Sequence, residues 1–362
     1  MSSVLKMSAA KERRIRQGLV GWYGKHQRRM PWRDTRDPYR IWLSEVMLQQ
    51  TQVKTVIPYY HRFLERFPTL EDLARGDLQE VLKMWEGLGY YARARNFHRA
   101  AGVVADAYDG RIPDRWEVFI KLPGVGEYTA AAVQSLAFGH PYAVVDGNVK
   151  RVLARLFLIS EPVNKPAVYK QLKALATRLM DRERPGTFNQ AIMELGALVC
   201  KPANPECGRC PVQGDCGGFQ ENRANEFPVK VRRKPVPTVH MIAGVIRKKG
   251  NVLITRRKPE GLLGGLWEFP GGELQKGEDA AVGCVRAIRE TTGLKVEIDS
   301  HLTRVKHAYT HFKIQLDVFY CRVLPGSRVR LNGPVDFHWI RLDDLDVYAF
   351  PKANIKFMHL LK

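Results

Sequence analysis

The segment IKLPGVGEYTAAAVQSLAFG, residues 120–139, decides the fold of the first part of this chain. We expect one helix to end near Lys121, a tight turn at Gly124 to Gly126, and a second helix to begin near Glu127. Glycine permits the backbone angles of such a turn and lets a phosphate approach the amides. The free N–H groups of the second helix point at the same phosphate. The segment therefore predicts a phosphate-binding hairpin, although the glycines alone would also fit an ordinary corner between two helices.

The charge of the chain supports a polyanionic partner. Its 362 residues carry 58 Lys and Arg against 37 Asp and Glu, a formal net charge of +21. Such a surplus favours nucleic acid, although a generally basic surface would also produce it. The N-terminus lacks the apolar core of a signal peptide, and no apolar run is long enough to cross a bilayer, so we expect a cytoplasmic protein.

The hydrophobic periodicity changes along the chain. Residues 11 to about 218 place apolar side chains at three- and four-residue spacing, for example throughout residues 41–67, and predict a mostly helical region. From Met241 the period becomes two, in MIAGVI, NVLITRR and FKIQLDVFYCRV, with one helix at roughly Ala280 to Thr291.

These patterns predict a multi-domain protein, with an all-α domain followed by an α+β domain. We place the first domain at residues 1–219 and the second at residues 239–362. The polar, basic and proline-containing residues 220–238 between them indicate an exposed linker.

Four of the six cysteines lie in one short segment with the pattern C-x6-C-x2-C-x5-C, formed by Cys200, Cys207, Cys210 and Cys216. Four thiolates so close in sequence can converge on one metal centre, and a tetrahedral sulfur set suits zinc or an iron–sulfur cluster. The spacing alone leaves both open. The remaining two cysteines, outside this segment, are expected to be buried thiols.

Two carboxylates stand in unusual surroundings. Glu45 lies in the apolar helical stretch IWLSEVMLQQ, where desolvation would raise its pKa and suit it to general-acid catalysis. Asp146 lies between an apolar run and a helix in AVVDGNVKRVLARLF. Ordinary alternatives exist for both, because Glu45 could be partly exposed and Asp146 could be a helix N-cap.

The hairpin, the segment VVDGNVKRV and the cysteine spacing together resemble the endonuclease III-like helix-hairpin-helix DNA glycosylases, and the resemblance covers the whole first domain. It implies a [4Fe-4S] cluster on the four cysteines and a structural cation at the hairpin, with no catalytic metal. It also implies a six-helix-barrel module at about residues 31–138, and an iron–sulfur module made of the N-terminal helix and residues 139–219.

Within that group the chain resembles the adenine DNA glycosylases, the MutY family. The resemblance implies that Glu45 protonates adenine at N7, that Asp146 stabilises the oxocarbenium-like sugar, and that Tyr128 and Asn148 orient the two carboxylates. Tyr128 stands where bifunctional members carry a lysine that forms a Schiff base, so we expect a monofunctional enzyme. The implied function is base excision repair by a monomer, which removes adenine opposite 8-oxoguanine or guanine in duplex DNA.

Base flipping and base recognition are assigned by the same resemblance. The segments MLQQTQV and WEGLGYYARARN resemble the family's wedge, and RRMPWRDTRDPY resembles its adenine pocket. The residues so implied to contact DNA or the base are Arg28, Trp32, Arg33, Gln50, Thr51, Leu88, Tyr90, Gly124, Gly126 and Gln190. Core packing is the alternative for the aromatic and arginine side chains among them.

The segment LWEFPGGELQKGEDAAVGCVRAIRETTGL, residues 266–294, resembles the Nudix fold, but Ala287 and Thr291 replace two of the metal-binding glutamates. A hard cation such as Mg²⁺ needs oxygen ligands, so we expect no pyrophosphohydrolase activity and expect substitutions of Ala287 and Thr291 to be silent. The resemblance implies instead that this domain recognises 8-oxoguanine through the turn Tyr309-Thr310-His311.

Three rival functions are weighed against this interpretation. An oxidised-pyrimidine lyase is opposed by Tyr128 and by the second domain. A nucleotide pyrophosphohydrolase is opposed by Ala287 and Thr291. A non-enzymatic DNA-binding scaffold is opposed by Glu45 and Asp146 occurring together. The implied setting is the bacterial cytoplasm, in association with the nucleoid.

Overall fold

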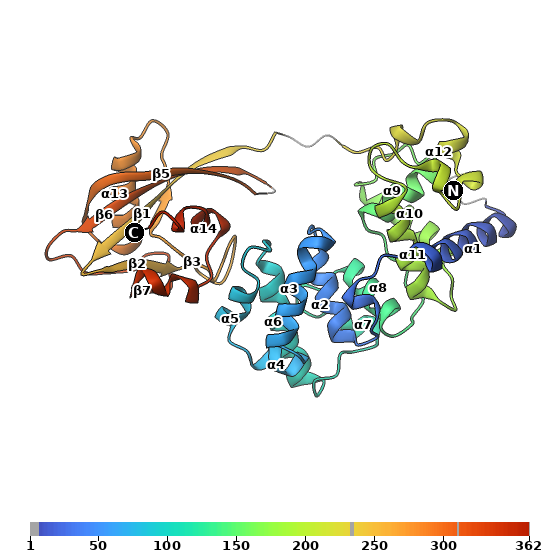
Figure 1. Ribbon diagram of the computed structural model, residues 1–362, viewed down its shortest axis with the longest axis horizontal. Coiled ribbons are helices and arrows are strands. Elements are labelled where there is room, and N and C mark those ends of the chain that lie inside the picture. The colour runs from blue at the N-terminus through green and yellow to red at the C-terminus, as the bar shows by residue number, and fades with distance from the viewer. Residues whose placement is uncertain (1–6, 232–234, 310, 362) are drawn as a thin grey trace. The chain divides into compact units, whose positions relative to one another are not determined.

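The computed structural model describes residues 7–231, 235–309 and 311–361, and confirms a helical region followed by a sheet-containing region (Figure 1). The chain divides into two compact units. The first contains residues 1–60, 69–71 and 100–233, and the second contains residues 61–68, 72–99 and 234–362. The domain boundaries drawn from the sequence stay a prediction, but the second unit also contains helical segments that precede the linker.

The helical region is built from short and medium-length helices separated by tight turns (Figure 1). The α-helices through residue 198 are α1 (Ala9–His26), α2 (Pro38–Leu48), α3 (Val53–Arg66), α4 (Leu70–Arg75), α5 (Leu78–Met84), α6 (Ala92–Ala107), α7 (Trp116–Phe119), α8 (Glu127–Leu136), α9 (Gly147–Leu156), α10 (Pro166–Leu179) and α11 (Pro185–Leu198). The shorter elements are η2 (Pro31–Arg33), η3 (Cys207–Arg209), η4 (Gln213–Asp215), α12 (Gly217–Gln220) and η5 (Ala224–Glu226).

The hairpin forms between α7 and α8. The second helix begins at Glu127, as the glycine pattern predicts, and Gly126 is its N-cap residue. Gly124 has φ +76°, in the left-handed region that glycine occupies without steric cost. Both glycines are exposed, so the turn presents backbone amides to solvent. The continuous helical periodicity of residues 41–67 is interrupted, because α2 ends at Leu48 and Gln50 adopts φ +57° before α3 begins.

The core of the first unit lies where α1, α9, α10 and α11 meet. Apolar side chains from each helix are buried there, including Leu19, Leu153, Leu172 and Phe188, which are each at most 1% exposed. The start of the predicted linker also belongs to this core, since Phe227 is 3% exposed and packs within it. Linker residues 232–234 lie outside the described residues.

The C-terminal sheet has seven strands in the order β3-β2-β1-β6-β5, with β4 paired to β1 and β7 paired to β2. The pair β1–β6 is parallel and the other pairs are antiparallel. The strands are β1 (Thr238–Lys248), β2 (Asn251–Arg256), β3 (Trp267–Glu268), β4 (Gly271–Glu273), β5 (Val296–Ala308), β6 (Lys313–Val323) and β7 (Asp336–Ile340).

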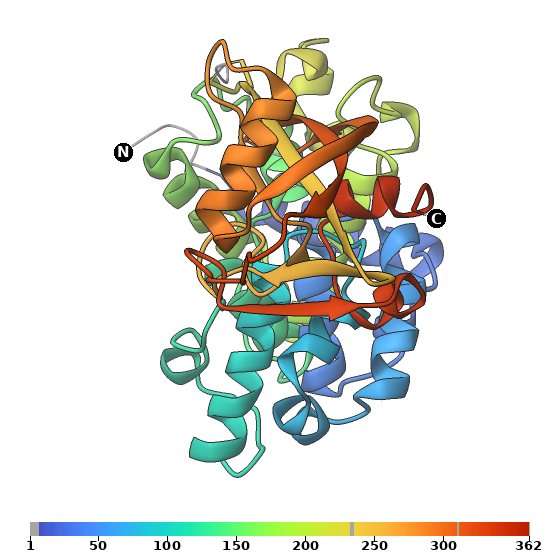
Figure 2. The ribbon, with the colours of Figure 1, turned by 90° about the vertical axis from the view of Figure 1, so that its left-hand side faces the viewer.

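Helices cover both faces of this sheet. The helix α13 (Ala280–Thr292) packs Cys284 and Ile288 on one face, and α14 (Lys352–Met358) packs Phe357 on the other (Figures 1 and 2). The helix at Ala280 that the sequence predicts is therefore confirmed. Its N-cap is Asp279, whose carboxylate accepts from the first amides of the helix. A six-residue 3-10 element, η6 (Leu342–Val347), leads from β7 toward α14.

The burial of Ala287 argues against the expectation that its substitution is silent, which stays a prediction. Ala287 is 2% exposed in the core between α13 and the sheet, and a Cβ built on Gly272 would lie 3.2 Å from its methyl group. A larger side chain in so buried a position would have to displace its neighbours. Thr291 is half-buried, and its hydroxyl donates to the Ala287 carbonyl oxygen at 2.7 Å. None of the described helices combines the length and the apolar composition needed to cross a membrane.

Candidate active site

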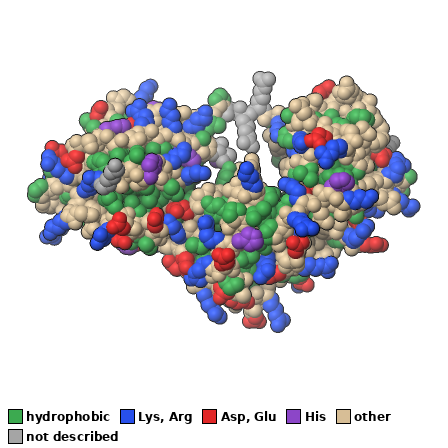
Figure 3. Space-filling view, in the orientation of Figure 1, with side chains coloured by type: hydrophobic (Ala, Val, Ile, Leu, Met, Phe, Trp, Pro, Cys, Tyr) green, Lys and Arg blue, Asp and Glu red, His purple; other side chains and the backbone are tan. Residues whose placement is uncertain are grey.

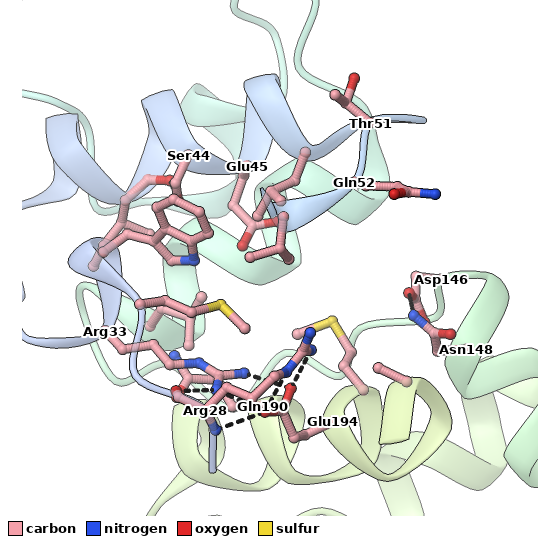
Figure 4. Close-up of a pocket in the computed structure, with 18 of the residues that line it drawn as sticks. Arg28, Arg33, Ser44, Glu45, Thr51, Gln52, Asp146, Asn148, Gln190 and Glu194 are labelled. Carbon is pink, nitrogen blue, oxygen red and sulfur yellow. Dashed lines mark hydrogen bonds and ion pairs between the residues drawn. The ribbon is translucent and has the colours of Figure 1, made fainter. Parts of the chain in front are cut away.

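A cavity of about 510 Å³ opens in the first unit between α2, α8, α11 and the start of α9. Figure 4 shows Glu45 on one wall, Asp146 and Asn148 on a second, and Arg28 with Glu194 on the side formed by α11. Segments more than a hundred residues apart in sequence thus bring both predicted carboxylates to one space.

Glu45 is the buried acid of this cavity. Glu45 lies on α2 and is 5% exposed, and the Tyr128 hydroxyl donates to its Oε2 at 2.8 Å. Burial raises the pKa of Glu45 to about 7, while the hydrogen bond from Tyr128 and the charge of Arg33 act in the opposite direction. Near neutral pH this carboxyl group is therefore partly protonated, which a general acid requires.

Asp146 is both a helix N-cap and a wall of the cavity. Its Oδ1 accepts from the Val149 amide at 2.7 Å, and its Oδ2 accepts from Asn148 Nδ2 at 2.9 Å. Burial raises the pKa of Asp146, and these hydrogen bonds oppose the rise. The N-cap alternative considered for Asp146 is thus correct, and it does not compete with a place in the cavity.

Asn148 is held in turn by Arg151, whose Nη2 donates to Asn148 Oδ1 at 2.8 Å. The same guanidinium donates to the carbonyl oxygens of Gly196 at 2.7 Å and of Cys200 at 2.7 Å. Because both side-chain ends of Asn148 are engaged, its amide has one orientation, and it presents N–H to Asp146. Arg151 therefore ties the start of α9 to the end of α11.

Glu194 was not predicted from the sequence, yet it organises the third side of the cavity. It is 1% exposed, and it accepts from Arg28 Nη2 at 2.7 Å and from Arg33 Nη2 at 3.0 Å. Burial alone would raise the pKa of Glu194, but hydrogen bonds from the two guanidinium groups hold it at about 2. The missed signal is helical spacing, since Glu194 follows the predicted Gln190 by four residues on one helix face.

Some of the other residues predicted to contact DNA or the base line this cavity, and others do not. Trp32, Thr51 and Gln190 line the cavity, and the Tyr23 hydroxyl donates to Gln190 Oε1. Gln50 lies in the exposed turn before α3. The contacts of these residues with DNA stay predictions.

The predicted wedge residues Leu88 and Tyr90 belong to the second unit. Tyr90 is 41% exposed, whereas Leu88 is 6% exposed in this conformation. Of these two side chains, only that of Tyr90 is presented to solvent. Figure 3 shows Lys and Arg side chains spread over the visible surface of both units, in keeping with the net charge.

The four cysteines of the predicted cluster loop are half-buried free thiols beside the helical core. Burial, together with the charges of the other three thiols, raises the pKa of Cys210 to about 12, so the four groups influence one another. Across the described residues, no three His, Cys, Asp or Glu side chains approach closely enough to hold a single metal ion. The cluster itself stays a prediction.

Arg155 is the central support of this loop. It is 1% exposed, and its guanidinium donates to Cys200 Sγ at 3.3 Å. It also donates to the carbonyl oxygens of Lys201 at 2.6 Å and Ala224 at 2.7 Å. One planar cation thus fixes both ends of the loop and supplies positive charge beside a thiol.

The predicted lesion-reading turn connects β5 to β6. Tyr309 packs its ring on Phe312, with 4.9 Å between ring centroids, and burial raises the pKa of Tyr309 to about 12. His311 is exposed. Thr310, the third predicted residue, lies outside the described residues. Packing therefore engages Tyr309, while the role of the turn in binding stays a prediction.

Comparisons with known proteins agree with this architecture. Residues 43–178 match the family described as HhH-GPD superfamily base excision DNA repair protein, and residues 242–360 match the NUDIX domain. The human adenine DNA glycosylase is 35% identical, over 94% of this chain and 73% of the human protein. The adenine DNA glycosylase of Buchnera aphidicola subsp. Baizongia pistaciae is 36% identical, over 96% of each chain. This chain belongs to the adenine DNA glycosylase family.

The helical part of the chain is also similar to solved structures of DNA-repair proteins. A thermostable thymine-DNA glycosylase has a TM-score of 0.55 and 32% identity, and covers 59% of this chain and 98% of its own. A non-covalent endonuclease III–DNA complex has a TM-score of 0.50 and 26% identity, over 58% and 97%. As a member of the adenine DNA glycosylase family, the protein is a hydrolase of N-glycosyl bonds in base excision repair, which confirms the enzyme class inferred from sequence.

Proposed function

We propose that this adenine DNA glycosylase removes adenine paired with 8-oxoguanine or guanine, after flipping the adenine out of the duplex and into the cavity of the first unit. One observation carries the proposal. A buried glutamate with a pKa near 7 shares a cavity with a hydrogen-bonded aspartate, in a chain similar to adenine DNA glycosylases along almost its whole length.

Glu45 supplies the proton. Protonation of adenine at N7 makes the base a better leaving group, so the bond from C1′ to N9 breaks and its electron pair leaves with adenine. The Tyr128 hydroxyl keeps the Glu45 carboxyl group in one orientation. Glu194, with Arg28 and Arg33 locked to it, forms the polar wall against which the base would rest.

Asp146 stabilises the sugar. Loss of adenine leaves positive charge at C1′ and O4′, and a carboxylate facing that charge lowers the barrier to bond breaking. Water then adds to C1′ and loses a proton, which gives an abasic sugar in an intact strand. The hydrogen bonds from Asn148 and the Val149 amide favour the ionised form of Asp146 that this role requires.

The absence of an amine at Tyr128 supports hydrolysis rather than strand cleavage, because a phenol cannot form an imine with C1′. Tyr128→Lys should introduce a borohydride-trappable adduct between protein and DNA. Failure to trap any adduct with this variant would weaken the role assigned to Tyr128.

We further propose that Cys200, Cys207, Cys210 and Cys216 hold a [4Fe-4S] cluster. Four cysteines in one short segment are the donor type that a [4Fe-4S] cluster takes, and the positive charge of a bound cluster would oppose the burial that raises the pKa of Cys210. The cluster would fix the loop that follows α11 and thereby support the DNA-binding surface. The Cys200 backbone, which accepts from Arg151, connects this loop to the start of α9.

The C-terminal domain is proposed to recognise 8-oxoguanine through the turn at residues 309–311. The replacement of two Nudix glutamates by Ala287 and Thr291 supports recognition in place of pyrophosphate cleavage. Thr310→Ala should weaken binding to 8-oxoguanine:adenine duplexes more than to guanine:adenine duplexes. Equal loss on both duplexes would remove Thr310 from lesion recognition.

The deciding experiment for the reaction uses Glu45→Gln in single-turnover assays. Duplexes with adenine opposite 8-oxoguanine or guanine, and one with thymine glycol, are incubated with protein and then treated with alkali to cut abasic sites. We expect wild-type protein to act on both adenine duplexes only, and Glu45→Gln to bind them without releasing adenine. Glu161→Gln, which neutralises an exposed glutamate before α10, serves as the matched control. Adenine release by Glu45→Gln would contradict the mechanism.

A further inference from the structure

The loop at residues 86–91, between α5 and α6, has an unusual backbone. Gly87 and Gly89 have φ +89° and +77°, and Tyr90 has φ +50° although it carries a side chain. A non-glycine residue in the left-handed region persists only where its surroundings hold it there. The loop therefore needs support, and the structure shows where that support comes from.

Part of the support is local. Trp85 Nε1 donates to the Gly89 carbonyl oxygen at 3.1 Å, and Arg93 Nη2 donates to the same oxygen at 2.9 Å. The Gly87 amide donates to the hydroxyl oxygen of Tyr91 at 3.2 Å. These bonds close the loop on itself and leave the Tyr90 ring 41% exposed.

Further support comes from the C-terminal part of the same unit. The Phe350 amide donates to Glu86 Oε1 at 2.8 Å, and the Tyr91 hydroxyl donates to the Phe350 carbonyl oxygen at 3.2 Å. Lys83 Nζ, 2.8 Å from Glu86 Oε2, also donates to the Tyr348 carbonyl oxygen at 3.1 Å. Both backbone groups of Phe350 are thus bound to side chains that flank the loop.

The segment at residues 348–350 is itself fixed to the sheet. The Trp267 amide of β3 donates to the Ala349 carbonyl oxygen at 2.9 Å. Phe350 is fully buried and stacks on Phe269, with 5.7 Å between ring centroids. A continuous path of short contacts therefore runs from the C-terminal sheet to the loop.

We propose that Glu86 and Tyr91 are positioning residues, through which the C-terminal sheet holds the 86–91 loop in the shape that presents Tyr90 to the DNA duplex. This inference rests on the base-flipping step proposed above. The C-terminal domain then contributes to adenine extrusion directly, by holding the wedge, in addition to any reading of the opposite base.

The test compares Tyr91→Phe with Tyr320→Phe in the full-length protein. Each variant loses one tyrosine hydroxyl that donates to a backbone carbonyl oxygen of the C-terminal region, Phe350 for Tyr91 and Leu360 for Tyr320. Hydrogen exchange should quicken at the Gly87 amide in Tyr91→Phe and stay unchanged there in Tyr320→Phe. Glu86→Ala should quicken exchange at the Phe350 amide, and it provides a second variant if Tyr91→Phe folds poorly.

Activity separates positioning from general damage. With adenine paired to guanine, Tyr91→Phe loses the hydrogen bonds to Gly87 and Phe350 and should release adenine about three- to tenfold more slowly. With adenine opposite an abasic site, where extrusion costs less, the rate should stay at the wild-type value. Equal slowing on both duplexes, or wild-type exchange at Gly87, would overturn the proposal. Failure of the proposed reaction would instead appear as a wild-type protein that releases adenine from neither duplex.

Discussion

Gly196 on α11 lies directly against Asn148 on α9. A methyl group built on Gly196 would stand 2.6 Å from the Asn148 Cβ and 3.1 Å from its Cα. The residue that orients Asp146 is therefore placed by the close approach of two helices, and only glycine permits that approach.

Gly196→Ala should push these helices apart and displace Asn148 from Asp146. Because small misplacements at a reacting centre are costly, we expect adenine release to slow by about tenfold or more. Gly21→Ala on α1, where a methyl group meets nothing within 4 Å, is the control and should keep wild-type activity. Single-turnover rates at saturating protein measure both. A fully active Gly196→Ala protein would show that this contact does not position Asn148.

The pH dependence of adenine release follows from Glu45. Since the acid must be protonated and its pKa is about 7, the rate should fall about tenfold per pH unit above that value. The Tyr128 hydroxyl stabilises the carboxylate form of Glu45, so Tyr128→Phe should raise the pKa of Glu45. The alkaline limb of the pH–rate profile should then shift to higher pH, by up to about one pH unit. A shift of the alkaline limb to lower pH in Tyr128→Phe would contradict the role given to this hydrogen bond.

Glu45 also lowers the stability of the fold at alkaline pH. Its pKa rises from 4.5 to about 7 on folding, so protonated Glu45 contributes to the stability of the fold. This contribution is fully present below pH 4.5 and is lost as the pH rises through 7. Glu45→Gln avoids the buried charge and should raise the free energy of unfolding by about 2–3 kcal/mol at pH 8. Denaturant titrations at pH 4 and pH 8 check this, and a gain of equal size at both would contradict it.

Arg155→Lys should release the cysteine loop. Lysine keeps the charge but cannot donate at once to Cys200 Sγ and to the carbonyl oxygens of Lys201 and Ala224. We expect the iron content and visible absorbance of purified protein to fall by roughly half or more, because a buried hydrogen-bond network is lost. Lys150→Arg, on the same helix, is the control. Unchanged iron content in Arg155→Lys would show that the loop folds without the hydrogen bonds of the Arg155 guanidinium.

Restoring the Nudix glutamates should have unequal effects. Ala287→Glu places a carboxylate in the core beneath α13 and should lower the free energy of unfolding by at least about 2 kcal/mol. Thr291→Glu, at a half-buried position, should be tolerated to within about 1 kcal/mol. Thermal unfolding measures both, and equal behaviour of the two variants would contradict the burial argument.

Much of this site was predictable because several of its residues stand in sequence contexts that can be recognised without the fold. An apolar helix around Glu45 and an aspartate before a helix are visible in the sequence, and both line the cavity. Glu194 was missed because its partners, Arg28 and Arg33, lie more than 160 residues away and only folding brings them together.

The fold shows the same division. Strands with clean alternation, such as β1 and β6, were predicted, but β5 was not. Its register shifts between Ile298 and Ser300 and between His301 and Thr303, and these irregularities disrupt the period of two. The break at Gln50 is equally hidden, since glutamine carries no turn signal and takes a left-handed backbone only in context.

The assembly of the second unit from residues 61–68, 72–99 and 234–362 has a consequence for biosynthesis. At about 5–20 residues per second, a ribosome needs on the order of ten seconds or more to travel from residue 99 to the end of the chain. During that interval the 86–91 loop exists without Phe350 to bind. In each new molecule the loop can therefore make these hydrogen bonds only after Phe350 has emerged from the ribosome.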